Sequence, residues 1–454
     1  MTKIQDTPIV ASVVGAGLVG SLLAIYLSRR GYKVQVYDRR SDLRTAKIYA
    51  GRSINLALSE RGWRGLQGVG IEPDVRKIGI PMYGRIMHSL DGSLSYQPYG
   101  TENQAIYSVS RGVLNLKLLE LADENPNVQF FFDEKCLDVN FEKTELSLEN
   151  KHTQVQTQVK SDLIFGADGA YSQVRQAMQI QPRFDFSQHY LAHGYKELNI
   201  PALPNGAFAL EQNALHIWGR KNFMLIALPN LDGSFTCTLF FPFEGEVSFE
   251  SLKTEAEVTA FFDTYLPDFT SLAPDCVAQF MQNPTASLVT MQCYPWKNGN
   301  TVLIGDAAHA IVPFYGQGMN SGFEDCTILD QILDTETDWQ KILSQFEASR
   351  KPNADAIAAL AQYNFIEMRD LTSDPQFILR KKIEAKIHKL YPEIWLPLYT
   401  MVTFSHIPYA ETVRISKIQD VFMHQILAMP NIENDWDSEA FELVIHEKIK
   451  TYKP

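Results

Sequence analysis

Three glycines near the N-terminus restrict the fold of this chain more than any other feature of its sequence. They are Gly15, Gly17 and Gly20, in the spacing G-x-G-x-x-G. An apolar run, Ile9–Val14, precedes them, and a helix-like run, Leu18–Arg30, follows. A second apolar run then ends at Asp38. Because strand, glycines, helix and strand in this order are typical of a dinucleotide-binding unit, we predict a Rossmann-like α/β domain.

Each glycine has its own expected role. Gly15 permits a tight turn, Gly17 lets the backbone approach a pyrophosphate, and Gly20 lets the helix pack closely on the strand. The helix N-terminus offers unpaired N–H groups to the phosphates. Asp38 lies eighteen residues after Gly20 and suits the acid that binds a ribose hydroxyl. Residues 9–27 carry no charge, but a membrane segment would not require these glycines or the acid that ends the second strand.

The overall composition narrows the class of function. A chain of 454 residues is long enough for two or three domains, and its net charge of −12 disfavours nucleic acid as a partner. The five cysteines are scattered without a C-x-x-C pair, so we expect reduced thiols in a cytoplasmic protein. The ten histidines show no H-E-x-x-H spacing, and we predict no bound metal.

Two later segments extend the nucleotide site. The sequence GADG places Asp168 at the end of a strand-like run, and GDAAH does the same for Asp306. A helix is predicted to begin near Gly318. A dehydrogenase needs only the first glycine motif. These segments suit a longer cofactor, whose polyol chain reaches Asp306 and whose ring carbonyl accepts from N–H groups at Met319 and Asn320. We therefore predict FAD.

A predicted hairpin carries the candidate substrate anchor. The segment GRIMHSLDGSLSYQPY alternates apolar and polar residues around an Asp-Gly turn. A two-residue turn would place Arg85 opposite Pro98. A three-residue loop would pair Leu90 with Leu94 and place Arg85 opposite Tyr99, and we favour this register. A guanidinium beside a phenol hydroxyl suits a carboxylate ligand, although an exposed arginine packed along a tyrosine ring is the commoner arrangement.

Two further segments were candidates for contact with the cofactor. Ser53–Arg61, within GRSINLALSERG, fits a short helix or a loop at the cofactor, and a surface helix fits equally well. Ser108–Pro126 is predicted to be a helix that Ser110 caps. Arg111 falls in its first turn, where a cation opposes the helix dipole, so we expect it to serve a phosphate or the flavin ring.

The domain organisation follows from changes in periodicity. Residues 184–295 contain strand-like runs and one clear helix, Glu255–Tyr265, so we predict a mostly β domain inserted into the nucleotide-binding one. The chain after it is largely helical. Asn364 lies on an apolar helical stripe, where it is either a core amide or a ligand contact. We divide the chain into an FAD-binding domain (1–78, 101–183 and 296–350), a substrate domain (79–100 and 184–295) and a helical C-terminal region (351–454) that closes the substrate site.

Together, the glycine fingerprint, GADG and GDAAH followed by PFYGQGMN resemble the single-component flavoprotein aromatic hydroxylases of the p-hydroxybenzoate hydroxylase fold. This resemblance covers residues 9–330. Within that group the chain is similar to the kynurenine 3-monooxygenase family, through the stretches GRSINLALSERG, YGRIMH, QPYG, VPFYGQGMN, NFIEMRD and FSHIPY.

The resemblance implies roles for individual residues. The amino-acid end of the substrate would be held by Arg85, Tyr99, Asn364 and Tyr409. The substrate ring would lie against Pro313, Phe314 and Tyr315, with Phe240 as a further candidate. The implied FAD contacts, beside the three glycines, Asp168 and Gly318, are Val19, Tyr37, Asp38, Arg39, Arg40, Ala57, Arg111, Cys136, Asp306, Met319 and Asn320. No general base is implied.

The reaction implied by the resemblance is the hydroxylation of L-kynurenine to 3-hydroxykynurenine. NADPH would bind transiently and reduce a tightly held FAD, and O2 would then form a flavin C4a-hydroperoxide that the substrate ring attacks. Hydroxylation of another aromatic carboxylate is the alternative reaction, and a non-catalytic flavin-binding module is the alternative function. The sequence does not fix NADPH over NADH or the oligomeric state.

The C-terminus differs from that of the eukaryotic members, which carry a hydrophobic anchoring tail. This chain ends in VIHEKIKTYKP, which reads as a charged helix. The expectation is therefore a soluble, cytoplasmic protein of the bacterial type that has no membrane partner.

Overall fold

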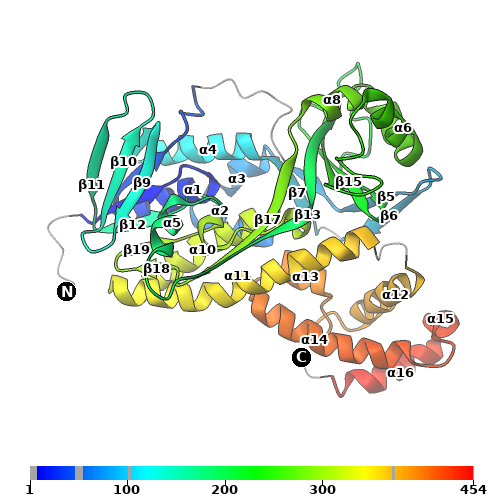
Figure 1. Ribbon diagram of the computed structural model, residues 1–454. Coiled ribbons are helices and arrows are strands. Elements are labelled where there is room, and N and C mark those ends of the chain that lie inside the picture. Colours follow the sequence, from blue (N-terminus) through cyan, green and yellow to red (C-terminus); the bar gives the residue numbers. More distant parts are fainter. Residues whose placement is uncertain (1–7, 46–54, 101–103, 371–373, 453–454) are drawn as a thin grey trace.

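The structure is a computed structural model that describes residues 8–45, 55–100, 104–370 and 374–452. Two large sheets dominate it, one of six mainly parallel strands and one of seven mainly antiparallel strands. The long helix α11 (Trp339–Asp370) contacts both of them, and the C-terminal helices gather at one end of it (Figure 1). This arrangement agrees with the predicted fold class, a Rossmann-like α/β domain with a mostly β part and a helical C-terminal region.

The six-stranded sheet has the order β18-β19-β12-β1-β2-β8. Its strands are β18 (Lys297–Asn298), β19 (Thr301–Leu303), β12 (Leu163–Gly166), β1 (Val10–Val14), β2 (Lys33–Asp38) and β8 (Val128–Phe132). All pairs are parallel except β18 with β19. The predicted strand–helix–strand unit is confirmed, since α1 (Leu18–Arg29) connects β1 to β2 and packs against α4 and α10.

Two of the three fingerprint glycines are required by close packing. Gly15 has a φ of +108°, and a Cβ atom there would lie 2.5 Å from the carbonyl oxygen of Ala167. A Cβ atom on Gly20 would lie 1.9 Å from the carbonyl oxygen of Gly15, so only glycine lets α1 approach the loop. A Cβ atom on Gly17 would meet nothing within 4 Å, which leaves open space above the loop.

The seven-stranded sheet has the order β17-β13-β16-β15-β14-β5-β6. Its strands are β17 (Ala286–Tyr294), β13 (Asp185–Ile200), β16 (Phe235–Pro242), β15 (Phe223–Pro229), β14 (Ala214–Arg220), β5 (Gly84–His88) and β6 (Leu94–Pro98). One of its faces packs on α6 (Glu255–Tyr265), α7 (Pro267–Leu272) and α8 (Cys276–Gln282) in a phenylalanine-rich core. The predicted helix Glu255–Tyr265 is confirmed, and the two shorter helices follow it.

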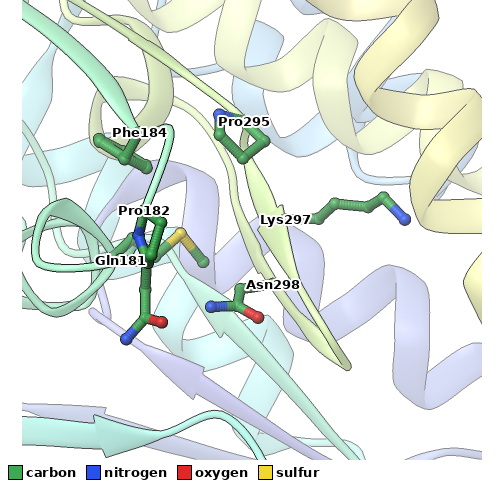
Figure 2. Close-up of a pocket in the computed structure, with 7 residues that line it drawn as sticks. Gln181, Pro182, Phe184, Pro295, Lys297 and Asn298 are labelled. Atoms are coloured by element: carbon green, nitrogen blue, oxygen red, sulfur yellow. The ribbon is translucent and has the colours of Figure 1, made fainter.

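Two of the chain segments that connect the sheets lie side by side. Pro182 and Phe184 precede β13, and Pro295 and Lys297 follow β17. They line a small cavity of about 260 Å³ together with side chains such as Asn298, as Figure 2 shows. The chain therefore enters β13 and leaves β17 at one place.

The hairpin forms, but both predicted registers are wrong. Arg85 pairs with Gln97, because the loop closes one residue earlier, with the Ser89 amide donating to the carbonyl of Ser93 at 2.9 Å. Leu90 and Leu94 are more than half exposed, so pairing them would bury little apolar surface.

Two further expectations need correction. Ser53–Arg61 is neither one helix nor one loop: the described part forms β3 (Asn55–Leu58), and α2 (Glu60–Gly68) follows. The strand forms because it pairs with β7 (Ile106–Ser110), a distant partner that local periodicity does not reveal. Ser110 does precede α4 (Arg111–Asp123), but its side chain makes no capping hydrogen bond.

The remaining elements complete the frame. The strands are β4 (Ile80–Met82) beside β7, and β9 (Glu134–Asn140), β10 (Glu145–Asn150) and β11 (Gln156–Lys160) in a separate sheet. The helices are α3 (Glu72–Arg76), α5 (Gln173–Gln179), α9 (Asp306–His309), the 3-10 helix η1 (Pro313–Tyr315), α10 (Gly318–Leu333), α12 (Pro375–Leu390), α13 (Leu398–Thr403), α14 (Tyr409–Leu427), α15 (Ile432–Asp435) and α16 (Glu439–Ile449). The expected boundary at residues 350/351 falls inside α11. Among the described residues no helix is long and apolar enough to cross a bilayer.

A chain of hydrogen bonds fixes β5 within the sheet. His88 Nδ1 lies 2.8 Å from Asp268 Oδ2, and His88 Nε2 lies 2.9 Å from His216 Nδ1. His216 Nε2 lies 2.9 Å from the carbonyl oxygen of Glu211, so this nitrogen carries a proton and donates it. These contacts join α7 and β14 to the strand that carries Arg85.

We expect His216 to make the stability of the protein depend on pH. Burial, the largest cause, lowers the pKa of His216 from 6.5 to about 4. Between about pH 6.5 and pH 4 His216 is protonated in the unfolded chain but neutral in the folded chain. The free energy of unfolding therefore falls as the pH falls through this range. The loss from this group is about 3 kcal/mol. Chemical denaturation at several pH values measures it, and a His216→Gln variant should show a flatter profile. An equally steep profile in that variant would contradict this origin.

Candidate active site

A cavity of about 590 Å³ lies between the two sheets and draws residues from both. Twenty-one of the residues singled out from the sequence line it. Those assigned to the cofactor are Gly15, Gly17, Val19, Tyr37, Asp38, Arg39, Arg40, Ala57, Arg111, Cys136, Asp168, Asp306, Gly318 and Met319. Those assigned to the substrate are Arg85, Tyr99, Phe240, Pro313, Phe314, Tyr315 and Asn364. Gly20, Asn320 and Tyr409 do not line it.

The nucleotide half of the cavity is built at the carboxyl ends of parallel strands. Asp38 ends β2, Asp168 follows β12 and Asp306 follows β19, and these strands lie close together in one sheet. Ligands of open α/β sheets bind at this edge. The three carboxylates therefore meet at one cavity although 268 residues separate Asp38 from Asp306.

The N-termini of two helices are open toward this half. Gly17 precedes α1 and Gln317 precedes α10, and neither residue caps its helix with a side chain. Gly17, Gly318 and Met319 line the cavity. Two uncapped N-termini, one for a pyrophosphate and one for a ring carbonyl, together with carboxylates that accept from hydroxyl groups, match the chemistry of a flavin dinucleotide.

Asp38 is already engaged by its own chain. Its carboxylate accepts from the Ala16 amide at 2.7 Å and from Arg40 through the amide, Nε and Nη2 at 2.8–3.0 Å. Burial raises the pKa of Asp38, but the hydrogen bonds and charge of Arg40 outweigh burial and lower it below the usual range. A ribose hydroxyl would therefore share this carboxylate with Arg40, whose side chain is about half exposed.

Asp168 has a structural task as well as a place in the cavity. It accepts from the Ser172 hydroxyl at 2.5 Å and the Gln173 amide at 2.6 Å, and so fixes the start of α5. Burial raises the pKa of Asp168 despite these hydrogen bonds.

The substrate half contains an arginine without an anionic partner. Arg85 Cζ lies 5.4 Å from the ring centre of Tyr99 and 5.2 Å from that of Tyr399. Arg85 forms no ion pair with any described residue; Glu367 acts on it from a distance and lies 3.6 Å from Lys381. A cation enclosed in this way requires an anion, and the cavity is where one can enter.

Tyr99 remains beside Arg85 although the predicted register is wrong. It lies two residues beyond Gln97, the partner of Arg85, and two residues along a strand return to the same face. Its hydroxyl is buried and makes no hydrogen bond of regular geometry within the described chain. The Tyr99 hydroxyl is therefore available to a ligand that lies beside Arg85.

Tyr399 was missed by the sequence reasoning. It lies on α13, lines the cavity and stacks on Tyr99 at 5.2 Å and on Tyr315 at 5.7 Å, with interplanar angles of 13° and 19°. The only sequence signal was its place in an uncharged run, residues 394–404, within a polar helical region. Such a run indicates that the segment is buried, but it does not indicate that Tyr399 lines a cavity.

Asn364 combines the two interpretations left open by its sequence. It is buried on α11 and lines the cavity, and its Nδ2 donates to the carbonyl oxygen of Phe314 at 2.7 Å. Phe314 in turn stacks on Phe365 at 4.2 Å and contacts Phe240 at 4.9 Å. The amide therefore holds the η1 wall in place at the rim of the cavity.

Asn320 and Tyr409 lie behind the cavity wall. Asn320 donates to the carbonyl oxygens of Ala57 and Gly316 at 2.8 and 2.7 Å, and thus ties β3 to the start of α10. The Tyr409 hydroxyl donates to Gln317 at 2.8 Å, and its ring lies 3.9 Å from Arg61 Cζ. Both side chains are buried and used by the protein itself.

Arg61 begins a chain of buried charges. It pairs with Glu324, and Glu324 pairs with Arg350 at 2.6 Å. Arg350 also pairs with Asp325 at 2.6 Å, and Asp325 accepts from His309 at the same distance. Arg61 Nε and Nη2 additionally donate to the carbonyl oxygens of Val402 and Ile407. These contacts join α2, α9, α10 and α11 to the C-terminal helices. The order of the charged chain is Arg61–Glu324–Arg350–Asp325–His309.

Comparison with known proteins places this site in a family. The model of the family "FAD binding domain" matches residues 6–361. A kynurenine 3-monooxygenase from Flavobacterium psychrophilum is 52% identical over 95% of this chain and 96% of its own, and one from Flavobacterium johnsoniae is 50% identical over 98% and 100%. A tetrameric form of 2-methyl-3-hydroxypyridine-5-carboxylic acid oxygenase shares the fold, with a TM-score of 0.66 and 20% identity over 82% of this chain and 96% of its own. The chain therefore belongs to the FAD binding domain family and, within it, to the kynurenine 3-monooxygenases.

Proposed function

We propose that this chain is an FAD-dependent monooxygenase that consumes NADPH and O2 and converts L-kynurenine into 3-hydroxykynurenine. The observation that carries the proposal is Arg85, a cation that has no anionic partner among the described residues, in a cavity that continues to the GADG and GDAAH loops. The carboxylate of an amino acid supplies the missing anion, and the family supplies the identity of that amino acid.

The protein contributes binding, orientation and exclusion of water. Arg85 and Tyr99 bind the substrate carboxylate, and Tyr399 closes over them from α13. Phe314 and Tyr315 present a buried aromatic wall to the ring. When bound, FAD would supply the redox chemistry: it would take the hydride of NADPH, and one oxygen atom of O2 would reach the ring while the other leaves as water. A dry cavity favours this transfer because water would divert the activated oxygen to hydrogen peroxide.

The remaining assignments are part of the same proposal. The fourteen cofactor-assigned residues that line the cavity would hold FAD, and Asn364 would contact the substrate. Asn364 on α11 and Tyr399 on α13 support a C-terminal region that closes the substrate site. The proposed domain ranges follow the two sheets. All five cysteines are buried and unpaired, which supports the reducing cytoplasm as the location.

Rapid mixing of the holoenzyme with NADPH tests the function. Kynurenine should accelerate flavin reduction, and mass spectrometry should find 3-hydroxykynurenine after O2 is admitted. Acceleration by another aromatic carboxylate, and not by kynurenine, would leave the cofactor assignment and replace the substrate. A flavin that NADPH does not reduce would leave only a flavin-binding module.

Two tyrosine variants should separate the cavity wall from the support behind it. Tyr399→Leu removes two ring stacks and should weaken kynurenine binding by about 0.5–1.5 kcal/mol for each. Tyr409→Phe removes only the hydrogen bond to Gln317 and should lower the free energy of unfolding by about 1 kcal/mol, with kynurenine affinity unchanged. Titration of the holoenzyme and chemical denaturation measure both effects. Weaker kynurenine binding in Tyr409→Phe would return that residue to the substrate site.

A further inference from the structure

One wall of the cavity is a face of the seven-stranded sheet, and a single hydroxyl interrupts its central strands. The residues that β14, β15 and β16 contribute to the lining are apolar, with one exception, Thr238. The apolar ones are Leu215, Ile217, Met224, Ile226, Leu228 and Phe240. An aromatic ring that lies on these three strands would therefore meet one polar side chain.

The Thr238 hydroxyl is not used by the fold. Thr238 is 4% exposed, and its side chain has no hydrogen-bond partner within residues 8–45, 55–100, 104–370 and 374–452. Thr236, two residues earlier on the same face, shows the contrast, because it exchanges hydrogen bonds with Asn230. The hydroxyl lies at the cavity, so a ligand group that reaches it forms a hydrogen bond that folding has left open.

The strand register places this hydroxyl on the side of the apolar wall that lies away from Arg85. Arg85 pairs with Leu215, Ile217 pairs with Ile226, and Ile226 pairs with Thr238. Thr238 is therefore three strands and two residues away from Arg85. With strand spacings of about 4.8 Å and a rise of about 3.4 Å per residue, the offsets are about 14 Å across the sheet and about 7 Å along it. A ligand whose carboxylate meets the Arg85 side chain extends across the apolar strip toward Thr238.

The chemistry of the proposed substrate supplies the matching group, so this step rests on the proposed function. In a 2-aminophenyl ketone, one N–H of the amino group binds the neighbouring carbonyl oxygen within the molecule. The second N–H points toward the adjacent ring carbon, which is the carbon to be hydroxylated. In a dry cavity this N–H requires an acceptor. We propose that the Thr238 hydroxyl accepts it and makes Thr238 the residue that selects a ring amino group.

The test compares two variants and two ligands. Thr238→Val removes the hydroxyl and keeps the shape of the side chain, whereas Thr238→Ser keeps the hydroxyl. Each holoenzyme is titrated with kynurenine and with 2-amino-4-oxo-4-phenylbutanoate, which lacks the ring amino group. We expect Thr238→Val to weaken kynurenine binding about tenfold, as the loss of one buried hydrogen bond does. The analogue should bind both variants within about twofold of the wild type.

Each outcome decides the proposal. Equal weakening of both ligands in Thr238→Val would show a general change of the wall and overturn it, as would unchanged kynurenine affinity. FAD content and thermal stability, measured on the same samples, should not change. If the wild-type holoenzyme binds neither ligand, the proposed function fails and this inference with it. If it binds kynurenine but Thr238→Val does not discriminate between the ligands, only the inference about Thr238 fails.

Discussion

Replacing Arg85 with methionine should weaken kynurenine binding by about 10- to 150-fold, the equivalent of 1.5–3 kcal/mol for a lost charge-assisted hydrogen bond. The reason is that Arg85 forms no ion pair with a carboxylate of the described residues. Its removal should therefore cost substrate affinity and leave the protein itself intact. Equilibrium titration of the holoenzyme measures the loss, and the KM for kynurenine should rise with it.

A lysine at the same position provides the matched control. Arg85→Lys keeps the positive charge but loses the planar pair of donors, so its affinity should lie between those of the wild type and Arg85→Met. Bound FAD should be equal in all three proteins, because Arg85 lies in the substrate half of the cavity. Affinity within twofold of the wild type in Arg85→Met would remove this residue from the substrate site.

Replacing Gly20 with alanine should abolish stable FAD binding and lower the melting temperature sharply. The added Cβ atom would lie 1.9 Å from the carbonyl oxygen of Gly15, a distance that backbone atoms cannot tolerate. Helix α1 would have to move away from the loop that receives the pyrophosphate. Flavin absorbance per chain and thermal unfolding followed by circular dichroism measure the two effects.

Gly17→Ala is the matched control for this clash. A Cβ atom there meets no protein atom within 4 Å, so the fold should be retained. The methyl group would still occupy space above the loop that the cofactor phosphates require, and FAD affinity should fall. A fully flavin-loaded Gly20→Ala variant would contradict the packing argument. A Gly17→Ala variant that binds FAD as tightly as the wild type would contradict the phosphate assignment.

The nucleotide half was predictable because its signals are local. The glycines at positions 15 and 20 indicate by their spacing that the backbone packs closely there. Asp168 and Asp306 each follow a strand of the same parallel sheet. Carboxyl ends of parallel strands share an edge, so a correct list of strands already brings these residues together. The sequence pattern was therefore sufficient to bring Asp168 and Asp306 to one edge of the sheet.

The substrate half depends on contacts that no local pattern encodes. The hairpin register was wrong because Leu90 and Leu94 face solvent, so their apolar character did not decide the pairing. Tyr399 lies beside Arg85 because α13 docks beside the Arg85 side chain, although more than 300 residues separate the two in sequence. Tyr409 belongs to a family stretch, yet it supports Gln317 behind the wall. The family motifs identified the C-terminal region that lies beside the cavity. They did not identify which of its tyrosines, Tyr399 or Tyr409, lines the cavity.

The buried charges that begin at Arg61 determine how the molecule can come apart. Detaching the C-terminal helices would strip Arg61 of the carbonyl groups of Val402 and Ile407 and open the chain to water from one side. Each cation and anion in it is neutralised only while its neighbours stay in place, so partial opening leaves uncompensated charge in an apolar interior. The C-terminal helices are thus expected to melt together with α2, α10 and α11 as one cooperative unit.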